Sequence, residues 1–171
     1  SYTARTNLVA YNTRKDSSNT IQQVNLVSDK KKCTITQKIT FDKPRKLDEL
    51  ILKFQNTQYS RANMALLYVE IWDITEDNCI FKESIGCSGI EDKEDFRIDL
   101  KGTKVVSNHQ YEIRLSGKSG GDCYLYGAEG DETKHKKAKL FPYFTKVQQK
   151  GIALVEINGK QGKGNLYFEM R

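Results

Sequence analysis

The chain has 171 residues with 28 Lys or Arg and 22 Asp or Glu, so its formal net charge is +6. Hydrophobic residues make up 37% and charged residues 29%, which is typical of one folded domain and excludes a disordered chain. No apolar run reaches the roughly 20 residues of a membrane helix. Arg5, Asn12 and Arg14 also interrupt any signal-peptide core after Ser1. We therefore expect any targeting segment to lie outside this chain.

Apolar and polar residues alternate with a period of two, which is typical of half-buried strands. From Cys33 to Phe41 every odd position can face a core, and Gln37 is the polar exception. No window of a dozen residues has helical periodicity, and we expect the best short helix candidate, 131–139, to be a charged loop. Further strands are predicted at 50–55, 66–72, 96–100, 111–115, 123–126, 151–157 and 165–170.

Turn residues separate these runs and define the fold class. Asn158-Gly159 lies between two expected strands, and residues 160–164 predict a connection longer than a two-residue hairpin. Strands at this spacing favour an all-β, antiparallel β-sandwich of the jelly-roll type with little helix. We expect a single domain over 1–171, with 1–16 as an extended edge segment and 127–150 as a lysine-rich insertion. The other turns are expected at Lys43-Pro44, Asp77-Asn78, Gly102, Ser107-Asn108 and 117–122.

The positive charge is concentrated in two clusters. One is Lys30 to Lys32, and the other is formed by Lys134, His135, Lys136, Lys137 and Lys139. They are interpreted as solvated loops, or alternatively as contacts for phosphates or acidic polysaccharides. No aromatic residues are interleaved with the lysines as in a base-stacking surface, so nucleic acid is not an expected partner.

Four cysteines are present, Cys33, Cys79, Cys87 and Cys123, and no pair has the spacing of a zinc or redox motif. A disulfide between Cys79 and Cys87 is one pairing, and two other full pairings exist. The alternative is free thiols on strands, which we expect. No N-x-S/T sequon occurs, so nothing indicates passage through a eukaryotic secretory pathway.

The motifs of common enzymes are missing from the sequence, and we do not expect an enzyme. His109 and His135 lie near no nucleophile elbow, and no phosphate-binding glycine motif is present. Carboxylates cluster at 91–95 and at Asp73, Glu76 and Asp77. Such clusters can hide a glycosidase pair or bind a structural calcium ion, but a solvated turn is the simpler interpretation. No other cofactor is expected.

Binding residues are sought among exposed aromatic and hydrogen-bonding side chains, because sugar rings stack on Trp and Tyr while their hydroxyls pair with polar groups. The first choice is the loop with Tyr59, Arg61 and Asn63, since loops carry function more often than strands. Trp72, Tyr124, Tyr126 and Tyr143 are further candidates, and core or inter-sheet packing is the alternative role for each.

Several of these stretches, in this order, resemble galactose-binding-like jelly-roll modules. The similar variety is the extracytoplasmic sandwich domain of bacterial membrane proteins of surface-polysaccharide metabolism. Its pattern runs Gln-x-Phe, a strand, a Tyr-x-Arg-x-Asn loop, a strand ending near Asp, and a Tyr-x-Ile strand; here Ile39 replaces the aromatic residue and Phe41 follows. The matching stretches are 36–41 (TQKITF), 47–54 (LDELILKF), 59–63 (YSRAN), 66–73 (LLYVEIWD), 96–100 (FRIDL) and 111–116 (YEIRLS).

The resemblance covers about residues 20–126, together with 165–170. It implies a non-catalytic, extracytoplasmic domain that binds a glycan or cell-envelope polysaccharide and is tethered to the membrane by segments outside this chain. Two alternatives stay open. One is a structural or protein-interaction domain without a small ligand, and the other is a basic surface that binds anionic polymers.

Overall fold

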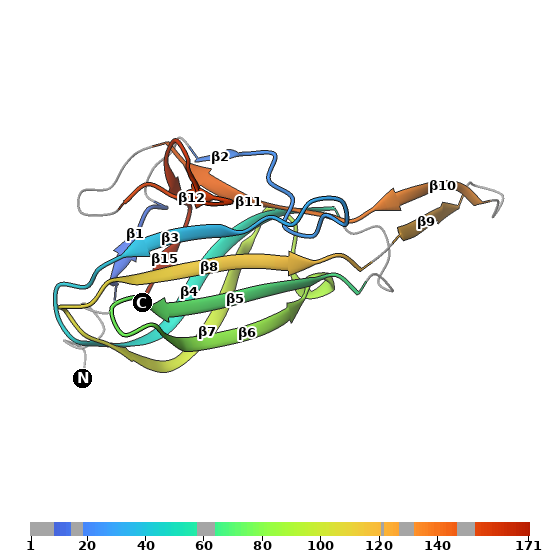
Figure 1. The fold of residues 1–171 in the computed structure, drawn as a ribbon. Coiled ribbons are helices and arrows are strands. Elements are labelled where there is room, and N and C mark those ends of the chain that lie inside the picture. The colour runs from blue at the N-terminus through green and yellow to red at the C-terminus, as the bar shows by residue number, and fades with distance from the viewer. Residues whose placement is uncertain (1–8, 15–18, 58–63, 121, 127–131, 147–152) are drawn as a thin grey trace.

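The computed structural model confirms an all-β antiparallel sandwich of two sheets, with a separate two-stranded ribbon at one end (Figure 1). The structure describes residues 9–14, 19–57, 64–120, 122–126, 132–146 and 153–171, and for 122–126 and 132–137 only the backbone. The finer assignment to a galactose-binding-like jelly roll stays a prediction. Within these ranges no helix is long and apolar enough to cross a bilayer.

Each sheet combines long central strands with short ones at its edges. The seven-stranded sheet has the order β1 (Tyr11–Asn12), β15 (Glu169–Met170), β4 (Arg45–Thr57), β11 (Lys139–Thr145) and β14 (Asn165–Leu166), with β2 (Asn19–Ile21) on β11 and β7 (Asp95–Val105) on β4. The six-stranded sheet has the order β13 (Lys160–Gln161), β12 (Glu156–Ile157), β3 (Ile35–Ile39), β8 (Tyr111–Lys118), β5 (Leu66–Asp73) and β6 (Asn78–Gly86). The ribbon pairs β9 (Asp122–Tyr126) with β10 (Glu132–Lys137), and a short 3-10 turn, η1, spans Cys87–Gly89.

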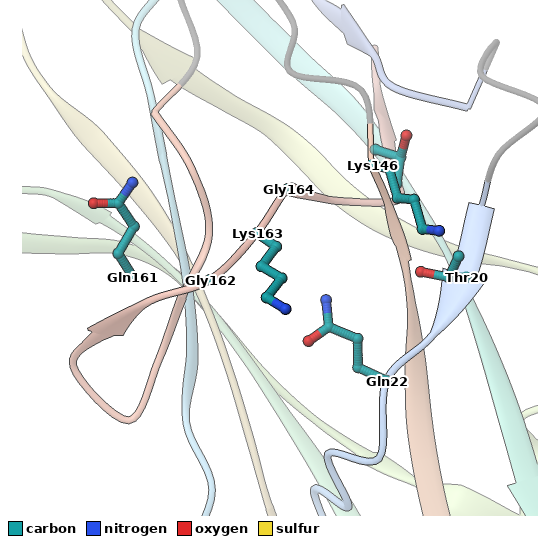
Figure 2. Close-up of a pocket in the computed structure, with 8 residues that line it drawn as sticks. Thr20, Gln22, Lys146, Gln161, Gly162, Lys163 and Gly164 are labelled. Atoms are coloured by element: carbon teal, nitrogen blue, oxygen red, sulfur yellow. The ribbon is translucent and has the colours of Figure 1, made fainter.

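The β12–β13 hairpin is tighter than the sequence predicts. Ile157 pairs with Lys160, so Asn158-Gly159 alone form the turn, with φ values of 53° and 80°. This left-handed pair suits Asn-Gly, which tolerates positive φ. The sequence did not predict the second strand, β13, because its two residues, Lys160 and Gln161, are polar and exposed and give no apolar pattern. After β13 the chain crosses to the other sheet through 162–164 and enters β14 (Figure 2).

The expected lysine-rich insertion contains a central strand. Residues 132–137, expected as a loop, form β10, and β11 follows as a buried member of the seven-stranded sheet. Pro142 argues against a central strand because it cannot donate a ladder hydrogen bond. Here it lies where β11 changes partners, from β4 at 139–142 to β2 and β14 at 143–145. The change of partner explains how the sheet accepts a proline.

Two further boundaries differ from the expected ones. Gly102 does not end a strand: β7 continues through it, with positive φ at Lys101 and Gly102 and a register shift opposite Leu47 and Glu49. This is a bulge, for which glycine is well suited. The expected strand 165–170 divides in two, because β14 pairs with β11 whereas β15 pairs with β4 and β1.

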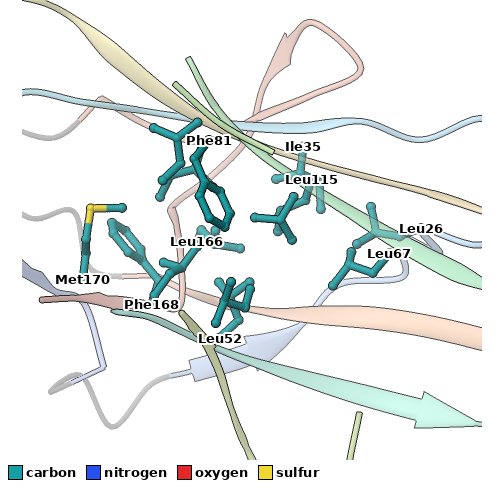
Figure 3. Close-up of a cluster of buried hydrophobic side chains, with 14 of the residues drawn as sticks. Leu26, Ile35, Leu52, Leu67, Phe81, Leu115, Leu166, Phe168 and Met170 are labelled. Atoms are coloured by element: carbon teal, nitrogen blue, oxygen red, sulfur yellow. The ribbon is translucent and has the colours of Figure 1, made fainter. Parts of the chain in front are cut away.

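The core fills the space between the two sheets. Figure 3 shows Leu52 of β4 and Leu67 of β5 pointing into it, together with Phe168. Gln37 is fully buried there, and its amide is satisfied on both sides. Its Nε2 donates to the Ala153 carbonyl at 2.8 Å, and its Oε1 accepts from the Leu166 N–H at 2.8 Å. The polar exception of the predicted strand therefore ties β3 to β14 and to the segment that precedes β12.

Three thiols are free, which agrees with the expected cysteines without disulfides. Cys87 is buried in η1, while Cys33 and Cys79 are half-buried. Burial raises the pKa of the Cys87 thiol to about 12. No bond joins Cys79 to Cys87, so that pairing is excluded.

Candidate functional site

The predicted site residues fall in three different places. Tyr59, Arg61 and Asn63 lie outside the described residues, so their role stays a prediction. Tyr124 and Tyr126 belong to β9, where they pair with His135 and Glu132 of β10 in the ribbon. Trp72 lies in β5, which is between β8 and the edge strand β6 of the six-stranded sheet. Figure 1 shows the ribbon projecting from the end of the sandwich at which β5 begins, whereas Trp72 is near the other end of β5.

Alternation along β5 places Trp72 on the outer face of the six-stranded sheet. Leu67, Val69 and Ile71 are fully buried in the core. The residues between them, Tyr68, Glu70 and Trp72, are half-buried on the opposite face. Trp72 is therefore not a core residue, so the alternative role of core packing does not apply to it.

Arg114 of β8 stacks on the indole ring of Trp72. Its guanidinium carbon lies 4.3 Å from the ring centroid, well within the range of a cation–π contact. Trp72 faces Glu112 in the strand register, so Arg114 approaches it diagonally. Arg114 Nε donates to Glu112 Oε1, a carboxylate that is only 9% exposed. The stack is thereby fixed by a buried counter-charge.

The polar end of Trp72 is also fixed. Its Nε1–H donates to Glu70 Oε1 at 3.0 Å, and the other Glu70 oxygen lies 3.9 Å from the Lys82 ammonium on β6. The row Lys82, Glu70, Trp72, Arg114 thus joins three strands on one face. At the next strand, β3, Lys38 pairs with Glu156 at 3.7 Å. The face is a set of polar groups held in place around one large ring.

Such a row has the chemistry that recognises a polyol. The Arg114 side chain is 35% exposed, and within the described chain its terminal NH₂ groups meet no acceptor. Guanidinium N–H groups donate to hydroxyls, carboxylates accept from them, and an aromatic ring packs against C–H groups. Because the side chains are oriented before any ligand arrives, binding costs less conformational entropy.

The outer face of the seven-stranded sheet is different. Tyr143 of β11 and Tyr167 are 9% and 7% exposed, and their ring centroids are 6.2 Å apart. The Lys53 ammonium lies 5.2 Å from the Tyr143 ring and 5.7 Å from the Tyr167 ring. Burial, then the charge of Asp92, raises the pKa of Tyr143 above its usual range. Tyr143, a candidate from the sequence, therefore has a packing role.

The remaining chemistry-bearing residues are structural where they are described. His109 Nδ1 lies 2.7 Å from Asp73 Oδ2, and the Gln110 N–H donates to Thr75 Oγ1 at 2.8 Å, so these contacts join two loops. Asp92 accepts from the Asn56 N–H at 2.8 Å. Over the part of the chain that the structure describes, no group of three or more His, Cys, Asp or Glu is arranged to hold a metal ion.

Sequence reasoning found Trp72 but missed its partners. Arg114, Glu112 and Glu70 appear in the sequence as ordinary polar positions of alternating strands. The signal that could have found them is their shared face with Trp72. It becomes readable only when the pairing of β5 with β8 is known, because a slip of one residue would move Arg114 to the other face.

No known family model matches the chain, and no curated protein matches its sequence. Among solved structures, a mutant of Xylanase10C from Cellvibrio japonicus in complex with xylopentaose is similar over 76% of this chain, at 9% identity and with a TM-score of 0.28. The similarity spans 20% of that chain's length. A TM-score of this size indicates neither a shared family nor a shared function.

Proposed function

We propose that the chain is a non-catalytic carbohydrate-binding module whose ligand lies on the outer face of the six-stranded sheet. The observation that carries the proposal is the Trp72–Arg114 stack with its ring-to-guanidinium distance of 4.3 Å, held by Glu112 and Glu70 on a half-exposed face. An aromatic ring fixed between hydrogen-bonding groups on a sheet face can contact both the apolar C–H groups and the hydroxyl groups of a sugar.

The ligand would contact the part of the half-buried Trp72 ring that Arg114 does not cover. The indole then contacts the C–H groups of a sugar ring, and Arg114 donates to its hydroxyls. Tyr68 and Ser116 face one another in the next outward-facing row, and Ser84 lies opposite Tyr68 on β6, so the face extends along the sheet. This length suits an oligosaccharide better than a single sugar.

The proposed location is outside the cytoplasm, as a domain of a larger bacterial envelope protein. This part of the proposal follows from the sequence resemblance alone. Detection of the native protein by antibody on intact bacterial cells tests it. Labelling of intact cells is expected, whereas signal that appears only after lysis would contradict this location without affecting the binding face.

The first experiment is a glycan array of bacterial envelope polysaccharides and neutral oligosaccharides, probed with the chain at low and high salt. We expect at least one neutral glycan to bind with little dependence on salt, because ring stacking and hydroxyl contacts do not rely on net charge. The Trp72→Ala variant should bind that glycan at least tenfold more weakly, and Trp72→Phe should retain most of the affinity because it keeps a ring.

Two other outcomes would contradict the proposed site or the proposed function. Glycan binding that is unchanged in Trp72→Ala would place the site elsewhere. No binding to any glycan would overturn the proposed function and favour the structural or protein-interaction alternative.

The basic-surface alternative has one observation in its favour: Lys30, Lys31 and Lys32 are all exposed. Binding to every anionic polymer, lost at high salt and in a variant with these three lysines changed to Gln, would support it. Such binding with no neutral hit would also overturn the proposed sugar site.

A further inference from the structure

A concave region separate from the Trp72 face lies at the edge where the two sheets meet. It is a pocket of about 450 Å³ between β2, the end of β11 and the crossover that follows β13. Its volume is in the range of pockets that bind small molecules. It is lined by Thr20, Gln22, Thr145, Lys146, Gln161, Gly162, Lys163 and Gly164. The pocket shares no residue with the Trp72 face.

Apart from Gly162 and Gly164, the lining residues have hydroxyl, amide or ammonium side chains. Lys146 and Lys163 contribute two ammonium groups, and no lining residue is a carboxylate. Among the described residues neither ammonium group takes part in an ion pair. Figure 2 shows Lys163 and Gln22 pointing toward one another across the pocket, with Lys146 beside Thr20 on its other side.

The crossover that carries Lys163 is held rigidly. The Gly162 N–H donates to the Val155 carbonyl at 2.7 Å, and the Val155 N–H donates to the Gly164 carbonyl at 2.8 Å. A Cβ on Gly164 would stand 1.9 Å from the Thr145 carbonyl oxygen, so only glycine fits this close approach. Lys163 is therefore presented from a fixed backbone, which lowers the entropic cost of binding.

We propose that this pocket binds the acidic group of a small polar ligand, a carboxylate, sulfate or phosphate. Lys146 and Lys163 supply the counter-charges, and Gln22 and Thr20 supply hydrogen bonds to the rest of the ligand. Two ammonium groups that form no ion pair with any described residue attract an anion without first having to release such a partner. The site is independent of the proposed sugar-binding face.

The test follows the backbone amide resonances of Gly162 and Gly164 by NMR while the whole chain is titrated. The probes are inorganic phosphate, sulfate and glucuronate, with glucose as the neutral control. We expect the anions, and not glucose, to shift both resonances. The double variant Lys146→Gln/Lys163→Gln should bind at least tenfold more weakly. The matched variant Lys104→Gln/Lys160→Gln, with the same loss of charge on two exposed lysines outside the pocket, should bind as the wild type does.

The named outcomes decide the proposal and identify the source of the ligand. Tighter binding of glucuronate than of phosphate and sulfate supports an acidic sugar, and the reverse order supports a free oxyanion. Equal shifts with glucose, equal weakening in both double variants, or no shift with any anion would overturn the site. Trp72→Ala should leave these titrations unchanged, so failure of the anion site and failure of the sugar face are distinguishable.

Discussion

The two outer faces of the sandwich carry aromatic rings in opposite ways. On the six-stranded sheet, Trp72 is half-buried and its ring is bordered by Arg114 and Glu70. On the seven-stranded sheet, Tyr143 and Tyr167 are at most 9% exposed and contact each other and Lys53. Both arrangements pair a ring with a cation. Only the first leaves the ring partly exposed to a ligand.

The difference shows why an aromatic residue on a strand does not by itself indicate a binding site. A buried ring contributes to stability through the apolar area that it removes from water. A ring that stays partly exposed, with its neighbours already oriented, still has apolar surface that a ligand can cover. Access distinguishes Trp72 from Tyr143, since both belong to strands within a sheet.

The largest expected effect separates the two faces by stability. Tyr143→Ala should lower the free energy of unfolding by about 3 kcal/mol, because it leaves a cavity at a buried ring. Trp72→Ala should lower it by about 1 kcal/mol, since the ring is half-buried and packs mainly on Arg114. Urea unfolding of the two variants measures both values. Equal losses would remove the distinction between the faces.

A smaller effect tests the Trp72–Arg114 stack itself. Arg114→Lys keeps the charge but loses the planar group that lies on the indole ring and donates to Glu112. We expect glycan affinity to fall several-fold, with the melting temperature nearly unchanged. The glycan identified on the array serves as the probe. Unchanged affinity would mean that Arg114 supplies only charge to this face.

The smallest effect extends the contrast in burial to a thiol. Burial raises the pKa of Cys87 from 9.0 to about 12, so the folded chain keeps the thiol protonated where the unfolded chain ionises it. This stabilisation is complete below about pH 9 and is lost as the pH rises toward about 12. Wild type should therefore lose about 1 kcal/mol more stability than Cys87→Ala between about pH 8 and pH 9.7. Urea unfolding at both pH values measures the difference. An equal loss of stability in wild type and in Cys87→Ala would contradict the burial of the thiol.

Strand prediction succeeded where one face of a strand is buried and the other is exposed to solvent. The alternation in 33–41 and 66–72 predicted β3 and β5, including the inward position of Gln37. It failed for β11, where Pro142 masked a buried strand, and for β13, whose two residues are exposed. Periodicity reports burial on one face, so strands that are buried on both faces or on neither give no such signal.

The candidate site was predicted only in part for the same reason. Trp72 is conspicuous as the one tryptophan of the chain. Its neighbours Arg114 and Glu112 are 42 and 40 positions away along the chain (114 − 72 and 112 − 72) and become neighbours only through the β5–β8 register. The pocket likewise combines Thr20 and Gln22, near the N-terminus, with Lys146 and Lys163, toward the C-terminal end of the chain.

The sequence by itself determined the all-β sandwich, because alternating burial is encoded in local spacing of two residues. It also determined the net positive charge and the glycine at the crossover. Only the tertiary structure decided which alternating residues share a face, which rings stay open and which lysines line a pocket. Those properties depend on strand register and on how the two sheets meet, and both are set by contacts between residues far apart in the chain.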